Sequence, residues 1–182
     1  AVHEGSVVLV RERHEHWGGA FWNIPSGQVE SHETPALGAV RELAEETGLI
    51  VAPGELHLVG TSTNEEVRSL AWNYTTSINS PTVAVDDPDG LVLEARWFTR
   101  AEAIDLLRQL PYRPLAEPVL AYLADRVQPR SHWLYETADA DPIVTPLGER
   151  SASHPALLAV FRHQLRTLAG RSHDSAAGAC AL

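Results

Sequence analysis

The segment Gly27–Leu49, "GQVESHETPALGAVRELAEETGL", constrains this chain more than any other part of it. If its second half is helical, Glu42, Glu45 and Glu46 stand at positions i, i+3 and i+4, and their carboxylates share one face. Like charges at this spacing repel each other. The segment therefore needs either water to screen its carboxylates or a cation to lie between them.

The residues at the two ends of this helix support its prediction. Thr34 suits the N-cap and Pro35 suits the first helical position. Gly48 suits the left-handed position that follows a helix. We therefore predict a helix over residues 35–47. Its inward-facing stripe is expected to consist of Leu37, Val40, Ala44 and Thr47.

The chain as a whole is also acidic. It has 24 Asp and Glu against 14 basic residues, all of them Arg, which gives a formal net charge of −10. A protein that coats nucleic acid or an anionic membrane needs a basic face, so we expect neither partner. An anionic substrate would have to bind through a cation. Clusters of carboxylate oxygens suit Mg²⁺ or Mn²⁺.

The spacing of residues in the acidic segment is more specific than its charge. Gly27 is followed by five residues, then Glu33, then seven residues, then the run "RELAEETGL" from Arg41 to Leu49. This pattern matches the Nudix box at each defined position, so the chain resembles the Nudix hydrolases, of the MutT-like kind. The resemblance is specific over Gly27–Leu49, weaker over residues 7–127, and does not cover residues 128–182. A solvated acidic helix face, the common fate of a charge run, is the alternative.

The resemblance implies an α+β fold, an α/β/α sandwich with a mixed sheet and a catalytic loop-helix-loop, plus a C-terminal extension. We expect residues 1–128 to form the Nudix domain, with a first strand that is incomplete at Ala1. We expect residues 129–170 to pack on the domain or on a partner, and residues 171–182 to be disordered. Strands are predicted at residues 7–10, 21–24, 49–51, 56–61, 71–78, 91–98 and 132–136. Further helices are predicted at residues 99–110, 115–127 and 155–168.

The resemblance also implies a metal site on the acidic helix. Glu42, Glu45 and Glu46 would bind one or more Mg²⁺ ions, with Mn²⁺ as a substitute, and the Gly27 carbonyl would complete the coordination. Either Glu42 or Glu46 would instead be the base that activates water. Metal ions in such a site neutralise a diphosphate and lower the pKa of bound water.

Two further residues of the box have implied supporting roles. Arg41 would orient the carboxylates, since its guanidinium can bind a carboxylate through two parallel hydrogen bonds. Glu33 would hold Arg41 or join the outer shell of the metal site. Some family members recruit another acid from outside the box. The candidates here are Glu65, Glu66, Asp86, Asp87 and Glu94, with the turn at residues 65–66 and Glu94 as first choices.

The residues that would bind the rest of the substrate are less defined. Arg11 and Arg13 follow the first complete strand and could touch phosphate, although a solvated strand end is equally plausible. Trp17, in the polar "HEHWGG" loop, is the best candidate to stack on a base, with core packing as the alternative. Ala116 stands where some MutT-type enzymes have an Asn that reads the base.

The predicted function is a Mg²⁺-dependent pyrophosphohydrolase that cleaves a diphosphate linkage in a nucleoside triphosphate or a related small nucleotide. The alternatives are a nucleotide-binding sensor without turnover and a hydrolase of ADP-ribose or a nucleotide sugar. The isomerase of the same fold needs a catalytic Cys, which Cys180 in the terminal tail cannot supply. No apolar run approaches a membrane span and no signal peptide is visible, so a cytoplasmic protein is expected. A homodimer is one role for the extension.

Overall fold

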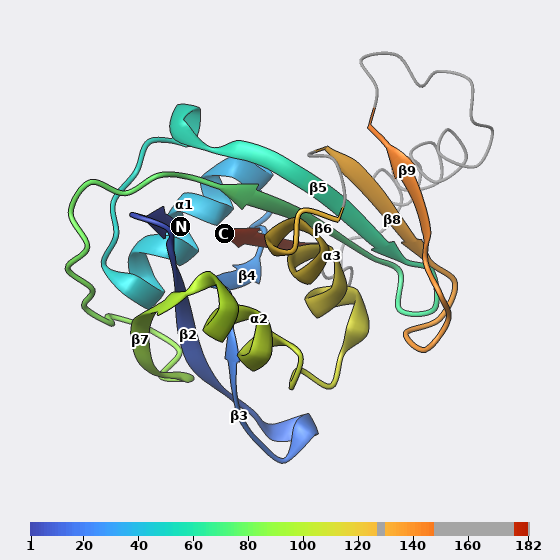
Figure 1. Ribbon diagram of the computed structural model, residues 1–182, viewed down its shortest axis with the longest axis horizontal. Helices are drawn as coiled ribbons and strands as arrows, with labels where there is room; N and C mark the ends of the chain where they lie inside the picture. The colour runs from blue at the N-terminus through green and yellow to red at the C-terminus, as the bar shows by residue number, and fades with distance from the viewer. Residues whose placement is uncertain (127–129, 148–176, 182) are drawn as a thin grey trace.

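The computed structural model describes residues 1–126, 130–147 and 177–181 (Figure 1). The strands are β1 (Val2–His3), β2 (Ser6–His14), β3 (Gly19–Asn23), β4 (Ser26–Gln28), β5 (His57–Asn64), β6 (Ser69–Thr75), β7 (Val92–Thr99), β8 (Ser131–Tyr135), β9 (Ile143–Pro146) and β10 (Ala177–Ala181). The helices are α1 (Pro35–Thr47), α2 (Arg100–Leu107) and α3 (Arg113–Leu123), with short 3₁₀ turns at Glu15–Trp17 and Pro53–Glu55.

The layers of the fold follow from the alternation of β2. Successive side chains of a strand point to opposite faces. Val7 and Leu9 pack in a core with residues of α2 and α3, whereas Val8 packs with Ala39 and Leu43 of α1. Helix α1 therefore covers one side of the strands, and α2 and α3 cover the other. This arrangement confirms the predicted α/β/α sandwich.

The strands form two sheets. In the first, β2 lies between β3 and β7 and also pairs with the short β1, all antiparallel. The second is mixed, with the order β4-β10-β6-β5-β8-β9, in which β5 is antiparallel to β6 and parallel to β8. The hairpin expected before residue 7 is present, since Val2 lies opposite Val7 and His3 opposite Ser6.

Helix α1 begins and ends at the predicted residues. The Thr34 hydroxyl accepts a hydrogen bond from the Leu37 amide at 3.3 Å, and Gly48 adopts the left-handed conformation with φ of 73°. The prediction of its inward stripe was wrong in part. Thr47 is buried, but Leu37 is 44% exposed, and the core side chains are those of Ala39 and Leu43.

The two helices on the other side lie near their predicted positions. A capping box begins α2, because Thr99 and Glu102 exchange side-chain and backbone hydrogen bonds. Helix α3 starts at Arg113, two residues before the prediction, and ends at Leu123 rather than continuing toward residue 127.

The C-terminal extension adds strands to the mixed sheet. Strand β8 runs parallel to β5, and β9 pairs with β8, so residues 131–146 continue the sheet of the domain (Figure 1). Trp133 and Tyr135 of β8 are buried. The predicted helix at 155–168 lies outside the described residues.

One predicted strand and part of the tail that was predicted to be disordered differ from the structure. Residues 49–51 form no strand, because the chain leaves α1 through the left-handed Gly48 and Leu49 is buried as a single core residue. Residues 177–181, expected in a disordered tail, form β10 between β4 and β6. The rest of that tail, 171–176 and 182, lies outside the described residues.

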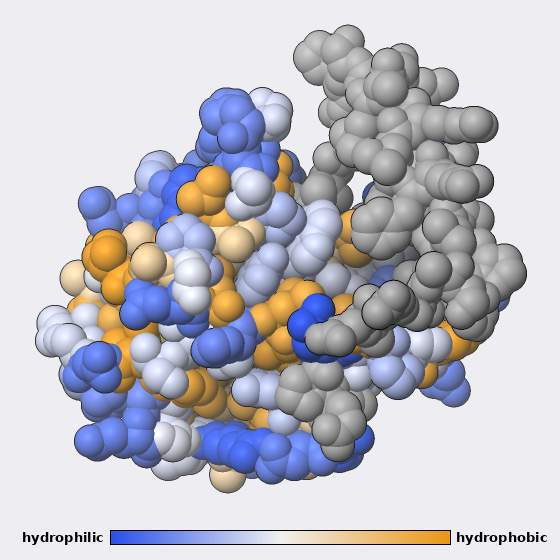
Figure 2. Space-filling view, turned by 90° about the horizontal axis from the view of Figure 1, so that it is seen from above, coloured by the Kyte–Doolittle hydropathy of each residue, from blue (hydrophilic) through white to orange (hydrophobic). Residues whose placement is uncertain are grey.

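The exposed apolar side chains of the described residues are scattered over the surface. Hydrophobic residues are interspersed with hydrophilic ones on the face seen in Figure 2, and exposed apolar side chains such as Ile50, Val67 and Ile143 come from different elements. Scattered residues of this kind are ordinary. Among the described helices, none has the length and apolar character needed to cross a membrane. The homodimer and the cytoplasmic location stay predictions.

Candidate active site

Arg41 lies at the centre of the acidic face of α1. Its Nη1 donates to Glu42 Oε1 at 2.7 Å and to Glu45 Oε2 at 3.1 Å. Its Nη2 donates to Glu33 Oε1 at 2.8 Å and to the Gln28 carbonyl at 2.9 Å, and its Nε donates to Glu33 Oε2 at 3.3 Å. The hydrogen bonds from Arg41 lower the pKa of Glu33, and those to Glu33 raise the pKa of Arg41. One guanidinium thus joins three carboxylates of the predicted site.

Gly27, in β4, lies directly against the side chain of Glu42, in α1. A Cβ built on Gly27 would lie 2.0 Å from Glu42 Oε1 and 2.4 Å from Oε2. No side chain can occupy that space while the carboxylate keeps its position. Burial raises the pKa of Glu42, and Arg41 opposes that effect.

Glu46 is the most buried carboxylate of the box, with 5% of the residue exposed. Its Oε2 accepts a hydrogen bond from the Ser26 amide at 2.9 Å. Burial raises the pKa of Glu46 to about 9, and the neighbouring charges of Glu12, Glu42 and Asp87 add to the rise. At neutral pH this carboxyl therefore retains its proton unless a cation comes close.

Glu12, on β2, is a member of the site that the sequence analysis did not identify. Burial raises its pKa to about 7, Asp87 and Glu42 add to the rise, and a hydrogen bond with Asn23 opposes it. The available signal was strand alternation, because Val8, Val10 and Glu12 share one parity on β2 and Val8 faces α1.

Asn23 connects Glu12 to Ser26, whose amide donates a hydrogen bond to Glu46. It is almost fully buried, its Oδ1 accepts from the Ile24 amide at 2.9 Å, and its Nδ2 donates to the Ser26 hydroxyl at 3.3 Å. Because the Ser26 amide donates to Glu46, a chain of polar contacts runs from β2 to the acidic helix. Asn23 was also missed, because nothing in the predicted strand over residues 21–24 marks it as part of the site.

Of the five acids considered outside the box, Asp87 is the one that interacts with the buried carboxylates. Its own side chain accepts hydrogen bonds from the amides of Asp89, Leu91 and Val92, which fixes the turn before β7. Glu94, a first choice, instead pairs with Arg11 at 3.4 Å, so the structure brings these two predicted substrate residues to each other. The other first choice, the turn at residues 65–66, contacts the extension, since Glu66 accepts from the Ala138 amide.

The donor set has the chemistry of a Mg²⁺ site, although it is not assembled as one. Within the part of the chain that the structure describes, no three acidic, His or Cys side chains converge on a common metal position. The carboxylates of Glu42 and Glu45 are directed at Arg41, and that of Glu46 at the Ser26 amide. Desolvated, mutually repelling carboxylates, one of which lies directly against the Gly27 backbone, fit a divalent cation. A bound cation would compete with Arg41 for two of them.

Trp17 lies at the tip of the β2–β3 hairpin within a group of aromatic rings. The centroid of its ring lies 4.1 Å from the ring centroid of His14. The centroid of the Tyr112 ring lies 6.4 Å away in a stacked arrangement, and that of the Phe21 ring lies 6.0 Å away in an edge-on arrangement. His14 Nε2 lies 3.2 Å from Glu12 Oε2, so the aromatic group adjoins the buried carboxylates. Trp17 is half-buried against the core, which leaves part of its surface accessible.

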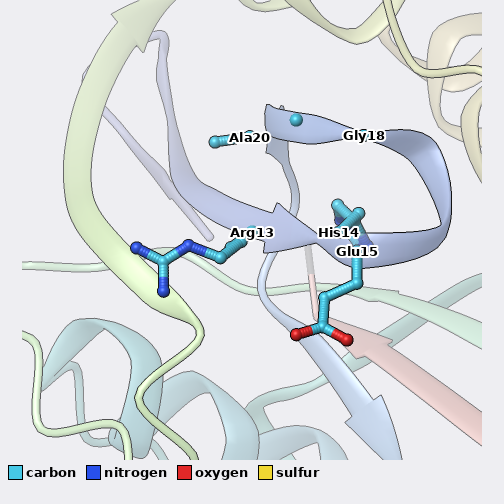
Figure 3. A pocket seen from close by; sticks show the side chains of 6 residues that line it. Arg13, His14, Glu15, Gly18 and Ala20 are labelled. Atoms are coloured by element: carbon cyan, nitrogen blue, oxygen red, sulfur yellow. The ribbon is translucent and has the colours of Figure 1, made fainter.

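An open pocket of about 330 Å³ lies on the same hairpin, lined by Arg13, His14, Glu15, Gly18, Gly19 and Ala20. Figure 3 shows the side chains of Arg13 and Glu15 extending from the hairpin in different directions. Arg13 is exposed, as its predicted phosphate contact would require.

Comparisons with known proteins show similarity in sequence and in fold. Residues 2–123 match the family model described as the NUDIX domain. The chain is 31% identical over 174 residues to the protein named "Putative 8-oxo-dGTP diphosphatase 3" of Mycobacterium tuberculosis, and the match covers 82% of this chain and 79% of that protein.

Two solved structures are similar at lower identity. A NUDIX hydrolase from Nitrosomonas europaea superposes with a TM-score of 0.53 at 21% identity, covering 72% of this chain and 71% of the other. The NUDIX domain of Shewanella oneidensis NrtR, solved with ADP ribose, superposes with a TM-score of 0.54 at 18% identity, covering 68% of this chain and 78% of the other. Both similarities concern the fold.

The family match extends over the first sheet, strands β4, β5 and β6 of the second, the three helices and the acidic segment. The match to the M. tuberculosis relative extends beyond it into the C-terminal part of the chain. The chain therefore belongs to the Nudix family and is a hydrolase of phosphoanhydride bonds.

Proposed function

We propose that this protein is a Mg²⁺-dependent pyrophosphohydrolase whose substrate is a nucleoside triphosphate or a closely related nucleotide. The observation that carries the proposal is the buried Glu46 carboxyl: burial raises its pKa to about 9, and the neighbouring charges of Glu12, Glu42 and Asp87 add to the rise. Such a group is costly without a cation. A cation held there would face an anionic diphosphate.

The chain's own residues would divide the work as follows. Glu42, Glu45, Glu46 and the Gly27 carbonyl would hold the metal, which when bound neutralises the diphosphate and lowers the pKa of water. Arg41 would keep Glu42 and Glu45 aligned, and Glu33 would keep Arg41 in place.

The base that takes the proton from water is either Glu42 or Glu46. The burial of Glu46 favours it, because a carboxyl with a raised pKa holds a proton near neutral pH once it has taken one. The hydrogen bond from the Ser26 amide orients its Oε2. Glu42 lies closer to Arg41, which favours its charged form.

The aromatic group on the hairpin supports a nucleotide substrate. A base stacking on the accessible part of Trp17 would lie near His14, whose Nε2 adjoins Glu12, while the exposed Arg13 could contact phosphate. The name of the M. tuberculosis relative, an 8-oxo-dGTP diphosphatase, is consistent with such a substrate and makes 8-oxo-dGTP the first compound to test.

A nucleotide-binding sensor without turnover was the second candidate from the sequence, and the membership of this chain in a hydrolase family speaks against it. Hydrolysis of ADP-ribose or a nucleotide sugar is the third, and the ADP ribose bound to the NrtR domain makes that compound a useful member of a panel.

The test is a panel of dGTP, 8-oxo-dGTP, ADP-ribose and a nucleotide sugar incubated with Mg²⁺, with products separated by ion-exchange chromatography. The proposal expects a nucleoside monophosphate and pyrophosphate from a triphosphate. Turnover of ADP-ribose alone would support the third candidate. Intact recovery of every compound, with Glu45→Gln indistinguishable from the wild-type protein, would contradict the enzymatic proposal.

A further inference from the structure

The C-terminal extension is attached to the N-terminal half of α3 by a part-buried polar contact. Tyr135, in β8, is fully buried, and its hydroxyl donates to Glu117 Oε2 at 2.9 Å. Burial raises the pKa of Tyr135, and the hydrogen bond with Glu117 and the charge of Glu117 add to the rise. Apolar packing alone would hold β8 against α3, so the hydroxyl–carboxylate pair adds direction to the contact.

Arg113 extends this attachment to the segment between β8 and β9. Its Nε donates to Glu117 Oε1 at 2.7 Å, its Nη1 to the Asp139 carbonyl at 2.7 Å, and its Nη2 to Asp141 Oδ1 at 3.1 Å. Both carboxylate oxygens of Glu117 are therefore bonded, one to Arg113 and one to Tyr135. The start of α3 is connected to the extension at three separate points.

The residue that immediately precedes Arg113 is Tyr112, which stacks on Trp17. The hydroxyl of Tyr112 accepts a hydrogen bond from Asn64 Nδ2 at 2.8 Å. Asn64 ends β5 and lies opposite Tyr135 in the parallel pair of β5 and β8. The next amide, that of Glu65, donates to the Tyr135 carbonyl at 2.9 Å. The extension therefore supports Tyr112 at its backbone, through α3, and at its hydroxyl, through β5.

From these contacts we infer that the extension, through Tyr135 and Glu117, positions Tyr112 against Trp17 and so sets the affinity for the base of the substrate. The inference rests on the proposed nucleotide function. Tyr135, Glu117 and Arg113 are positioning residues, because they act through Tyr112 and not on the substrate. The extension thus has a role in substrate selection, in addition to completing the mixed sheet.

Tyr135→Phe tests this inference, since it removes the hydroxyl and keeps the ring. Binding of the non-hydrolysable probe α,β-methylene dGTP is measured by calorimetry with Mg²⁺, and KM and kcat are measured for dGTP. Loss of one hydrogen bond should raise Kd and KM roughly threefold to tenfold, with kcat and the Mg²⁺ activation constant unchanged. Glu117→Gln, which keeps the volume and an acceptor, should give a smaller rise and guards against misfolding of the first variant.

Tyr122→Phe is the matched control, because Tyr122 lies on the same helix near its other end. It should leave Kd unchanged. The same rise in Tyr122→Phe as in Tyr135→Phe would show a general loss of helix stability and would overturn the inference.

A double-mutant cycle separates positioning from structural support. In a Trp17→Leu background, where the base has no ring to stack on, Tyr135→Phe should change Kd by less than twofold. An unchanged effect in that background would overturn the inference. Nucleotide binding with equal Kd in wild type and Tyr135→Phe would overturn the inference alone, whereas no binding of any nucleotide by wild type would overturn the proposed function as well.

Discussion

The Gly27 backbone lies directly against the Glu42 carboxylate, so that a Cβ on Gly27 would be 2.0 Å from Glu42 Oε1. We predict that Gly27→Ala displaces this carboxylate and lowers kcat/KM by about 100-fold, the order expected when a catalytic group moves by about 1 Å. Thermal unfolding should change little, because the φ angle of Gly27 is open to other residues.

Gly54→Ala is the control for this prediction. A Cβ at Gly54 would meet no atom within 4 Å, so the same substitution there has no steric consequence. Equal activity of the two alanine variants would mean that the contact between Gly27 and Glu42 does not matter to the reaction.

Arg41→Lys tests the orienting role of Arg41. A lysine ammonium cannot reproduce the forked hydrogen bonds to Glu33, Glu42 and Glu45. Loss of an outer-shell partner of a metal site lowers activity by about 10–100-fold, and we predict a fall of that size with a higher Mg²⁺ requirement. The comparison is Arg108→Lys, whose exposed pair with Asp105 should be dispensable. An Arg41→Lys enzyme with wild-type Mg²⁺ activation would refute the role.

The helix of the acidic segment was predictable because its signals are local. Thr34, Pro35 and Gly48 define its ends without reference to the rest of the chain. Its buried face was not predictable from apolar periodicity. The strands approach α1 at Ala39 and Leu43, which leaves Leu37 in solvent. Which side of a helix is covered depends on long-range packing that a short segment does not encode.

The residues of the site that the sequence did not reveal reach it through sheet pairing. Glu12 interacts with the box because β2 pairs with both β3 and β7 and faces α1. Asn23 reaches the site because β3 ends just before Ser26, whose amide donates to Glu46. Asp87 could be named only as one of several acids, since its approach depends on the loop before β7. Likewise, Tyr112 meets Trp17 only once α3 is docked on β5.

Asn23→Ala should weaken both stability and activity. The substitution leaves the Ile24 amide without its side-chain partner and removes the hydrogen bond to Glu12, which costs about 1–3 kcal/mol of unfolding free energy. Because Ser26 loses its contact with Asn23, we also expect kcat to fall. Urea unfolding and steady-state kinetics measure the two effects. Asn79→Ala, at an exposed position, should show neither, and a stable and fully active Asn23→Ala would contradict the polar chain.

The raised pKa of Glu46 predicts a defined pH dependence of stability without metal. Burial raises this pKa from 4.5 to about 9, so the folded state binds a proton that the unfolded state releases. The contribution of Glu46 is therefore fully present below about pH 4.5 and is lost as pH rises toward 9. Subtracting the Tm of Glu46→Gln from that of the wild type removes the effect of other groups.

This difference in Tm should fall steadily between pH 5 and pH 9, and added Mg²⁺ should reduce the fall, because a cation stabilises the charged carboxylate. A difference that is constant over this range, or that grows with pH, would show that Glu46 is not buried next to other carboxylates.

The most direct test of the account is the Mg²⁺ dependence of pyrophosphate release from the substrate identified in the nucleotide panel, compared between wild type and Glu46→Gln. The control is Glu4→Gln, whose side chain is 86% exposed. The account predicts that wild type and Glu4→Gln lose activity in EDTA and regain it with Mg²⁺, and that Glu46→Gln is at least about 100-fold slower at saturating Mg²⁺. Release that survives chelation, or a Glu46→Gln enzyme as fast as wild type, would contradict it.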